Sequence, residues 1–90
     1  MTEDELKKFK EKLVETTTFP SVYMFKFIVP SEHRNIALVE NLFEEEADIH
    51  TKESESGKYI SITATQVAMN AEEILHIYKK ASEVKGIIFL

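Results

Sequence analysis

The sequence contains no cysteine among its 90 residues, which excludes disulfides, thiolate zinc sites, iron–sulfur clusters and cysteine nucleophiles. Glycine occurs only twice, and the chain has no phosphate-binding loop, dinucleotide-binding fingerprint or Ser-His-Asp pattern. No apolar run is long enough to span a membrane, and the N-terminus has no apolar signal region. We therefore expect a cytoplasmic chain that binds no metal and no cofactor and that is not an enzyme.

Positive charge is in the minority, with 11 Lys and Arg against 16 Asp and Glu and a formal net charge of −5. Nucleic acids and membrane surfaces are polyanionic, so neither is an expected partner. Hydrophobic residues at 43% and charged residues at 30% are ordinary for a globular domain and too apolar for a disordered chain. The core is small, because a chain of this size buries only about 60% of its unfolded surface.

An amphipathic helix is predicted over residues 2–16. Thr2 and Glu5 fit the capping box, in which a hydroxyl caps the first turn and a Glu binds back to the cap. An apolar stripe then recurs at helical spacing, formed by Leu6, Phe9, Leu13 and Val14. Phe19-Pro20 ends this segment. We assign residues 1–18 to the N-terminal helix and residues 19–90 to the main domain.

The main domain predicts the element order β-α-β-β-α-β. Strands are expected at 21–29, 48–54, 59–67 and 87–90, and helices are expected to begin at Ser31 and Asn70, the first of them extending to about Ala47. Gly57 is the expected residue of positive φ in the hairpin turn. Two split βαβ units with right-handed crossovers give a ferredoxin-like α+β fold. Its four-stranded antiparallel sheet has both helices on one face and the first and third strands in the middle.

Lys26 assigns the two faces of this sheet, because an ammonium group does not sit unpaired between helices and sheet. Tyr23, Phe25 and Phe27 should therefore point at the helices. The opposite face is half apolar and is a candidate interaction surface, with Val22, Met24, Lys26 and Ile28 on its first strand. Either the N-terminal helix or another chain should cover it. We favour the first arrangement, and hence a monomer over a homodimer, because tethering keeps the helix close.

Arg34 is a candidate anion contact, because it lies in the first turn of the predicted helix after Pro30. A solvated surface Arg is the alternative. His50 and Asp48 should share one side of an edge strand, near Glu53. There they could bind a divalent ion weakly, or they could simply be solvated side chains that bind nothing. His76 is expected on the outer face of the last helix.

Acidic residues are concentrated between residues 44 and 55. Lys52 is the only base there, against six acids: Glu44, Glu45, Glu46, Asp48, Glu53 and Glu55. Charge runs are usually solvated. The functional alternative is a docking surface for a basic protein partner.

From Phe19 onward the chain resembles the YbeD-like family of small bacterial proteins. The resemblance is carried by Phe19-Pro20 before an aromatic-rich strand, by the hairpin of residues 54–59 and by the alternating strand of residues 60–65. It also includes the segment 72–78 and the apolar C-terminal strand. The resemblance implies a ferredoxin-like fold akin to the ACT regulatory domains, and the family has no established biochemical activity.

Together these features predict a regulatory or protein-interaction module with no catalytic role. Two alternatives stay open. The first is an ACT-like domain that senses a small ligand at the loop of residues 29–35. The second is a small hydrolase that binds an anionic substrate through Arg34 and Lys26.

Overall fold

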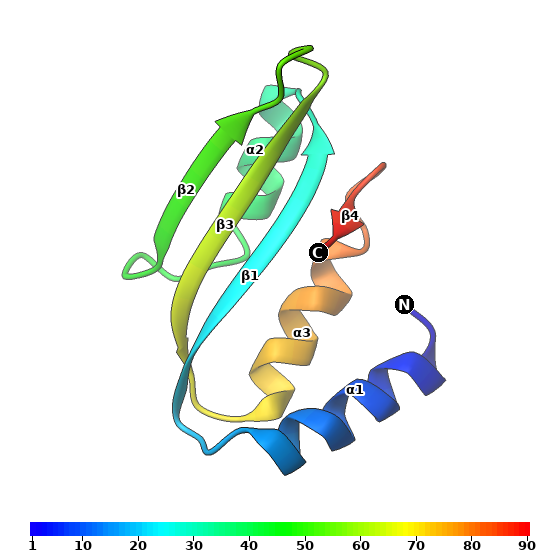
Figure 1. Cartoon of the computed structure of the whole chain (residues 1–90), viewed down its shortest axis with the longest axis vertical. Coiled ribbons are helices and arrows are strands. Elements are labelled where there is room, and N and C mark those ends of the chain that lie inside the picture. The colour runs from blue at the N-terminus through cyan, green and yellow to red at the C-terminus, as the bar shows by residue number, and fades with distance from the viewer.

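Helices and strands follow one another along the chain in the order α-β-α-β-β-α-β. A computed structural model describes all residues, Met1–Leu90. Its elements (Figure 1) are α1 (Glu3–Thr16), β1 (Ser21–Pro30), α2 (His33–Glu40), β2 (Asp48–Glu53), β3 (Tyr59–Ala68), α3 (Ala71–Ala81) and β4 (Ile88–Phe89). No helix has both the length and the apolar character needed to cross a lipid bilayer.

The four strands form one antiparallel sheet in the order β2-β3-β1-β4. β1 and β3 pair along their full length, from Ser21 opposite Ala68 to Pro30 opposite Tyr59. β4 pairs with β1 only through Ile88 and Phe89. The prediction that the first and third strands are central is confirmed, and the arrangement is consistent with a ferredoxin-like fold.

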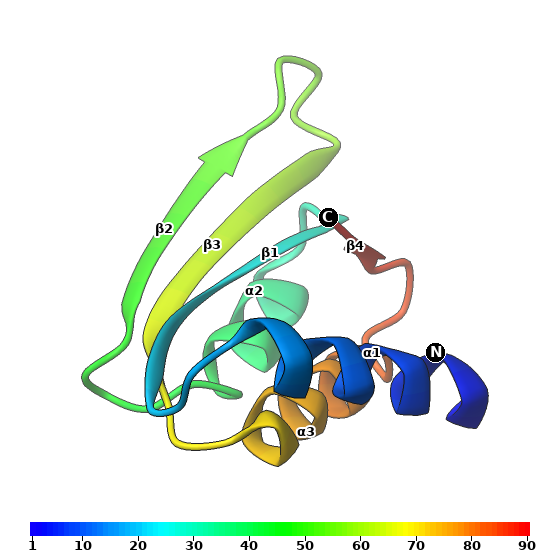
Figure 2. The same ribbon diagram turned by 60° about the horizontal axis from the view of Figure 1, so that its bottom comes forward.

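The core lies on one face of the sheet, where α2 and α3 cover it (Figure 2). Alternate residues of β1 point to this side, and Phe25, Phe27 and Val29 are fully buried. Phe25 and Phe27 are therefore on the side predicted from the position of Lys26, and Ile62 and Ala64 of β3 join them there. Tyr23 also faces the helices but is only partly buried.

Helix ends follow the capping signals in two of the three helices. The Thr2 hydroxyl and the Glu5 carboxylate complete the predicted capping box of α1. The Asn70 side chain accepts a hydrogen bond from the backbone of Glu73 at the start of α3. The prediction that the second helix begins with Ser31 as its cap was wrong, because α2 begins after Glu32 and has no side-chain cap.

α2 is shorter than predicted and ends at Glu40 rather than near Ala47. The residues that follow still pack on the core, but they do so from a turn. The Phe43 ring lies 5.3 Å from that of Phe25 and 6.4 Å from that of Phe27. The packing of Phe43 against these two rings stabilises the turn more than further helical turns would, although the apolar residues are spaced for a longer helix.

The position of α1 corrects our prediction that the N-terminal helix covers the candidate interaction surface. α1 instead packs beside α3, as Figure 2 shows. The Phe9 and Tyr78 ring centroids are 5.3 Å apart, Leu13 is buried, and Lys10 Nζ lies 2.8 Å from Glu72 Oε1. In this position the apolar stripe of α1 shields the aromatic side of the core, which would otherwise stay in water.

Candidate functional site

The sheet face turned away from α2 and α3, here called the open face, is uncovered. Val22, Met24 and Val67 are 67%, 62% and 53% exposed. Val22 lies directly opposite Val67 in the sheet register, so these side chains form one continuous apolar area. Ile88 lies opposite Ile28, and it extends this area onto β4. The open face comprises Val22, Met24, Lys26, Ile28, Tyr59, Ser61, Thr63, Thr65, Val67, Ile88, Asp48, His50 and Lys52.

Lys26 lies in the middle of the open face, opposite Thr63. Its side chain is exposed and forms no ion pair, and the backbone carbonyl accepts a hydrogen bond from Leu90 N–H at 3.1 Å. If another surface covered Lys26, its attraction for a carboxylate would be stronger than in open water, because the local dielectric constant would fall.

β2 forms the polar margin of the open face. His50 Nε2 lies 3.1 Å from Asp48 Oδ2, and both side chains are largely exposed. The prediction that the two residues share a side is confirmed. Glu53 lies opposite Ile60, whose side chain is buried against the helices, so it points away from this pair. No group of three or more metal-ligating side chains forms here or elsewhere in the chain.

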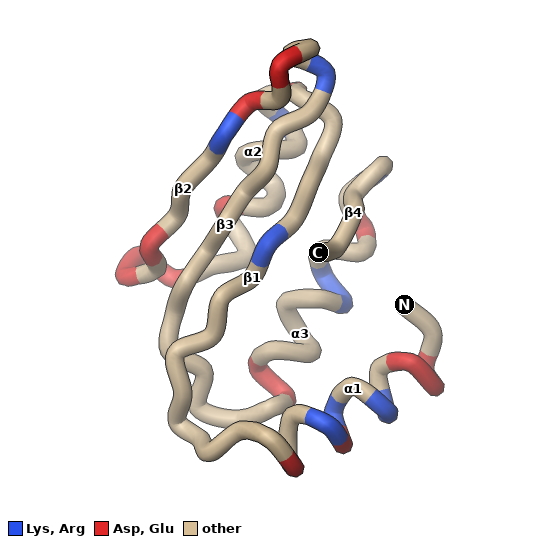
Figure 3. Tube along the Cα trace, viewed as in Figure 1, with Lys and Arg blue, Asp and Glu red and all other residues tan.

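The acidic segment divides into two clusters rather than one surface (Figure 3). Residues 44–46 lie in the loop before β2 and Asp48 is its first residue, whereas Glu53 ends β2 and Glu55 lies in the turn before β3. The rise along β2 separates the clusters by about 16 Å. The strand predicted over 48–54 already implies this separation, because the two ends of an extended strand lie far apart.

The loop after β1 is filled by its own residues. Asn35 is buried, and its side chain donates a hydrogen bond to the Pro30 carbonyl at 3.0 Å. Gly86 approaches so closely that a Cβ there would lie 2.9 Å from Pro30 Cγ. Ser31 N–H donates to the Lys58 carbonyl at 2.9 Å. These contacts occupy the space in which a sensed ligand would have to bind, so they disfavour the ligand-sensing interpretation.

Arg34 is exposed near the start of α2. α2 lies on the covered face of the sheet, while Lys26 lies on the open face. The sheet therefore separates the two cations, and they cannot bind one anion together. This geometry disfavours the hydrolase interpretation.

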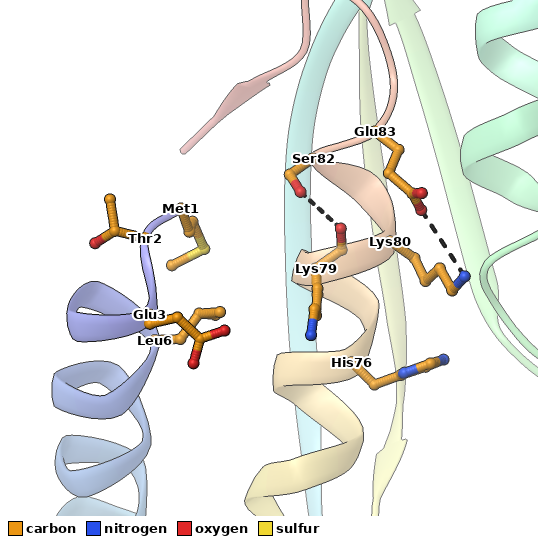
Figure 4. Close-up of a pocket in the computed structure, with 9 residues that line it drawn as sticks. All are labelled: Met1, Thr2, Glu3, Leu6, His76, Lys79, Lys80, Ser82 and Glu83. Carbon is orange, nitrogen blue, oxygen red and sulfur yellow. Dashed lines mark hydrogen bonds and ion pairs between the residues drawn. The ribbon is translucent and has the colours of Figure 1, made fainter.

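A groove between α1 and α3 is a feature that the sequence analysis missed (Figure 4). It has a volume of about 650 Å³, and Met1 and Leu6, at the N-terminal end of α1, line one wall. His76 and Lys79 from α3 line the other. His76 is exposed, as predicted, but it lies at this groove. The sequence predicts the apolar stripe of α1 but does not indicate that α3 is its partner.

Two tyrosines meet between α3 and β1. The hydroxyl oxygens of Tyr23 and Tyr78 are 3.1 Å apart. Burial of Tyr78, aided by the Tyr23 hydroxyl, raises the pKa of the Tyr78 hydroxyl well above its ordinary value. The Tyr78 hydroxyl therefore stays protonated at neutral pH and offers no general base.

The elements and the uncovered sheet define a small α+β domain with one free face. Residues 14–90 match the profile of a family described as "Protein of unknown function (DUF493)". The chain belongs to this family of small YbeD-like proteins, which confirms the resemblance stated from the sequence. The match begins near the end of α1, so most of that helix lies outside it. Neither the curated proteins nor the solved structures compared with the chain gave a match.

Proposed function

We propose that the protein is a non-enzymatic regulatory module that docks a partner protein on its open face. One observation carries this proposal: the continuous apolar area of Val22, Met24 and Val67 is exposed to water. Proteins that act alone rarely leave contiguous apolar surfaces uncovered, and such patches often mark interaction sites. The apolar side chains alternate with buried ones along β1, so they are not required for packing the core.

The chemistry of the open face specifies the partner. Lys26 would lose its water on docking, and a desolvated ammonium needs a carboxylate to compensate. The matching surface is therefore apolar, with an Asp or Glu at its centre. Cations at the rim of that surface would be attracted by residues 44–46 and Asp48, which lie at one end of β2.

The absence of an assembled catalytic set supports a binding role. Asp48 and His50 pair only with each other, and Arg34 lies on the far side of the sheet from Lys26. None of these groups converges on a common point where a substrate could react.

The test compares capture of cellular proteins by the wild-type chain with capture by open-face variants. We expect Met24→Glu and Lys26→Glu each to weaken a captured interaction by tenfold or more, measured as a Kd with the purified partner. Leu38→Glu is the matched control, because Leu38 is an exposed apolar residue on α2, away from the open face. A partner that binds both open-face variants as tightly as wild type would contradict the proposal.

A further inference from the structure

α1 is held on α3 through only part of its length. Near its C-terminal end Leu13 is buried, Phe9 contacts Tyr78, and Lys10 pairs with Glu72. Near its N-terminal end the helix stands away from α3 and leaves the groove of about 650 Å³. Figure 4 shows Glu3 and Leu6 extending from α1 toward α3 across this space.

The charges of the two helices match along their antiparallel course. Lys10 contacts Glu72 in the first turn of α3, while Glu3 shares the groove with Lys79 in its last turn. Antiparallel helices also place opposite dipole ends side by side. The surface of α3 therefore suits a helix that is acidic at its start and basic further along.

The attachment of α1 is small compared with that of the other helices. Leu13 is its only buried residue, whereas α3 buries five. Val14 is 62% exposed and Met1 is 45% exposed. A four-residue link, 17–20, joins the helix to β1, and isolated helices of this length are marginal in water.

We propose that the surface of α3 beside Tyr78 is a helix-binding site, that α1 is its internal occupant, and that an amphipathic helix of a partner protein displaces α1. The partner helix runs antiparallel to α3. It carries an aromatic residue, a basic residue immediately after it and an aliphatic residue four positions after the aromatic one, as Phe9, Lys10 and Leu13 do. This site is distinct from the open face and does not depend on the function proposed for that face.

Tethering makes α1 a strong competitor. A short link gives an effective concentration in the millimolar range, so a free helix binds only in the fraction of molecules whose own helix has left. The double variant Phe9→Asp/Leu13→Asp, here called the opening variant, releases α1 in the full chain. We expect a free helix to bind the opening variant about 10²-fold more tightly than it binds the wild type.

The probe is a fluorescein-labelled peptide of residues 1–16, titrated into each full-length protein by fluorescence anisotropy. The expected result is a gain of at least tenfold in affinity for the opening variant, lost when the peptide carries Phe9→Asp. Equal affinities would show that α1 does not occlude the site, and the absence of binding to either protein would overturn the proposal. A wild-type dimer that dissociates in the opening variant would make a second copy the occupant and would refute the internal role of α1.

A second experiment tests the site without disturbing buried residues. In the full chain with Glu72→Lys, the contact with Lys10 becomes repulsive. A peptide with Lys10→Glu should then bind at least threefold more tightly than the unmodified peptide. For a chain that retains Glu72, the unmodified peptide should instead bind more tightly than the Lys10→Glu peptide. The same order of affinities for both chains would exclude the antiparallel register.

Discussion

Replacement of Phe25 by alanine should remove a large part of the free energy of unfolding. Phe25 is fully buried, and its ring lies 4.7 Å from Tyr23, 5.3 Å from Phe43 and 5.4 Å from Tyr78, between centroids. Truncation of a buried Phe costs about 3–5 kcal/mol. Domains of this size have a total stability of about 5–14 kcal/mol, so the loss would bring the protein close to its folding threshold.

The assay is urea denaturation followed by circular dichroism. With a slope of about 1 kcal/mol per molar urea for a small domain, the midpoint should fall by roughly 3–5 M. Met24→Ala is the matched control, because Met24 is the adjacent residue on the exposed side of β1. This substitution should lower the free energy of unfolding by no more than about 0.5 kcal/mol. If the two variants lost the same free energy, the assignment of β1's faces would be wrong. Should Phe25→Ala not fold, Phe25→Leu against Met24→Leu makes the same comparison with smaller losses.

Three further perturbations test other parts of the structure. Above pH 10 the unfolded chain releases the Tyr78 proton while the folded chain retains it, so the free energy of unfolding should fall by up to about 1.4 kcal/mol per pH unit. Tyr78→Phe should reduce this slope in urea melts between pH 8 and 11. An unchanged slope would contradict the raised pKa of Tyr78. Gly86→Ala should destabilise more than Gly57→Ala in thermal melts, because both have positive φ but only the first Cβ would strike Pro30; the reverse order would contradict that close approach. Changing the glutamates of 44–46 to glutamine should leave the melting temperature nearly unchanged, because these side chains are exposed, whereas a drop of several degrees would mean that they support the fold.

Much of the sheet could be predicted because one residue breaks an otherwise apolar strand. Lys26 requires solvent, and the strict alternation of strand residues then fixes the face of Phe25 and Phe27. The near-continuous apolar run of β1 places it inside the sheet rather than at an edge. Gly57 has the predicted positive φ, because the hairpin needs a residue without a Cβ there.

The position of α1 could not be predicted, because it depends on contacts between distant parts of the chain. The stripe of Leu6, Phe9 and Leu13 indicates that one side of the helix is buried, but two or more apolar surfaces can bury it equally well. The end of α2 at Glu40 likewise depends on where the Phe43 ring finds its partners. Local patterns specify the face of an element, and tertiary packing selects what that face meets.

The meeting of Tyr23 and Tyr78 gives the molecule an internal optical probe. The chain contains three tyrosines and no tryptophan. Tyr59 is exposed at the hairpin, so its environment should change little when the helices move. The other two rings lie 6.4 Å apart at 83° to each other, and Phe9 of α1 contacts one of them. Near-ultraviolet circular dichroism therefore arises mainly where α1 meets the core, and it can follow the attachment of that helix in the unlabelled protein.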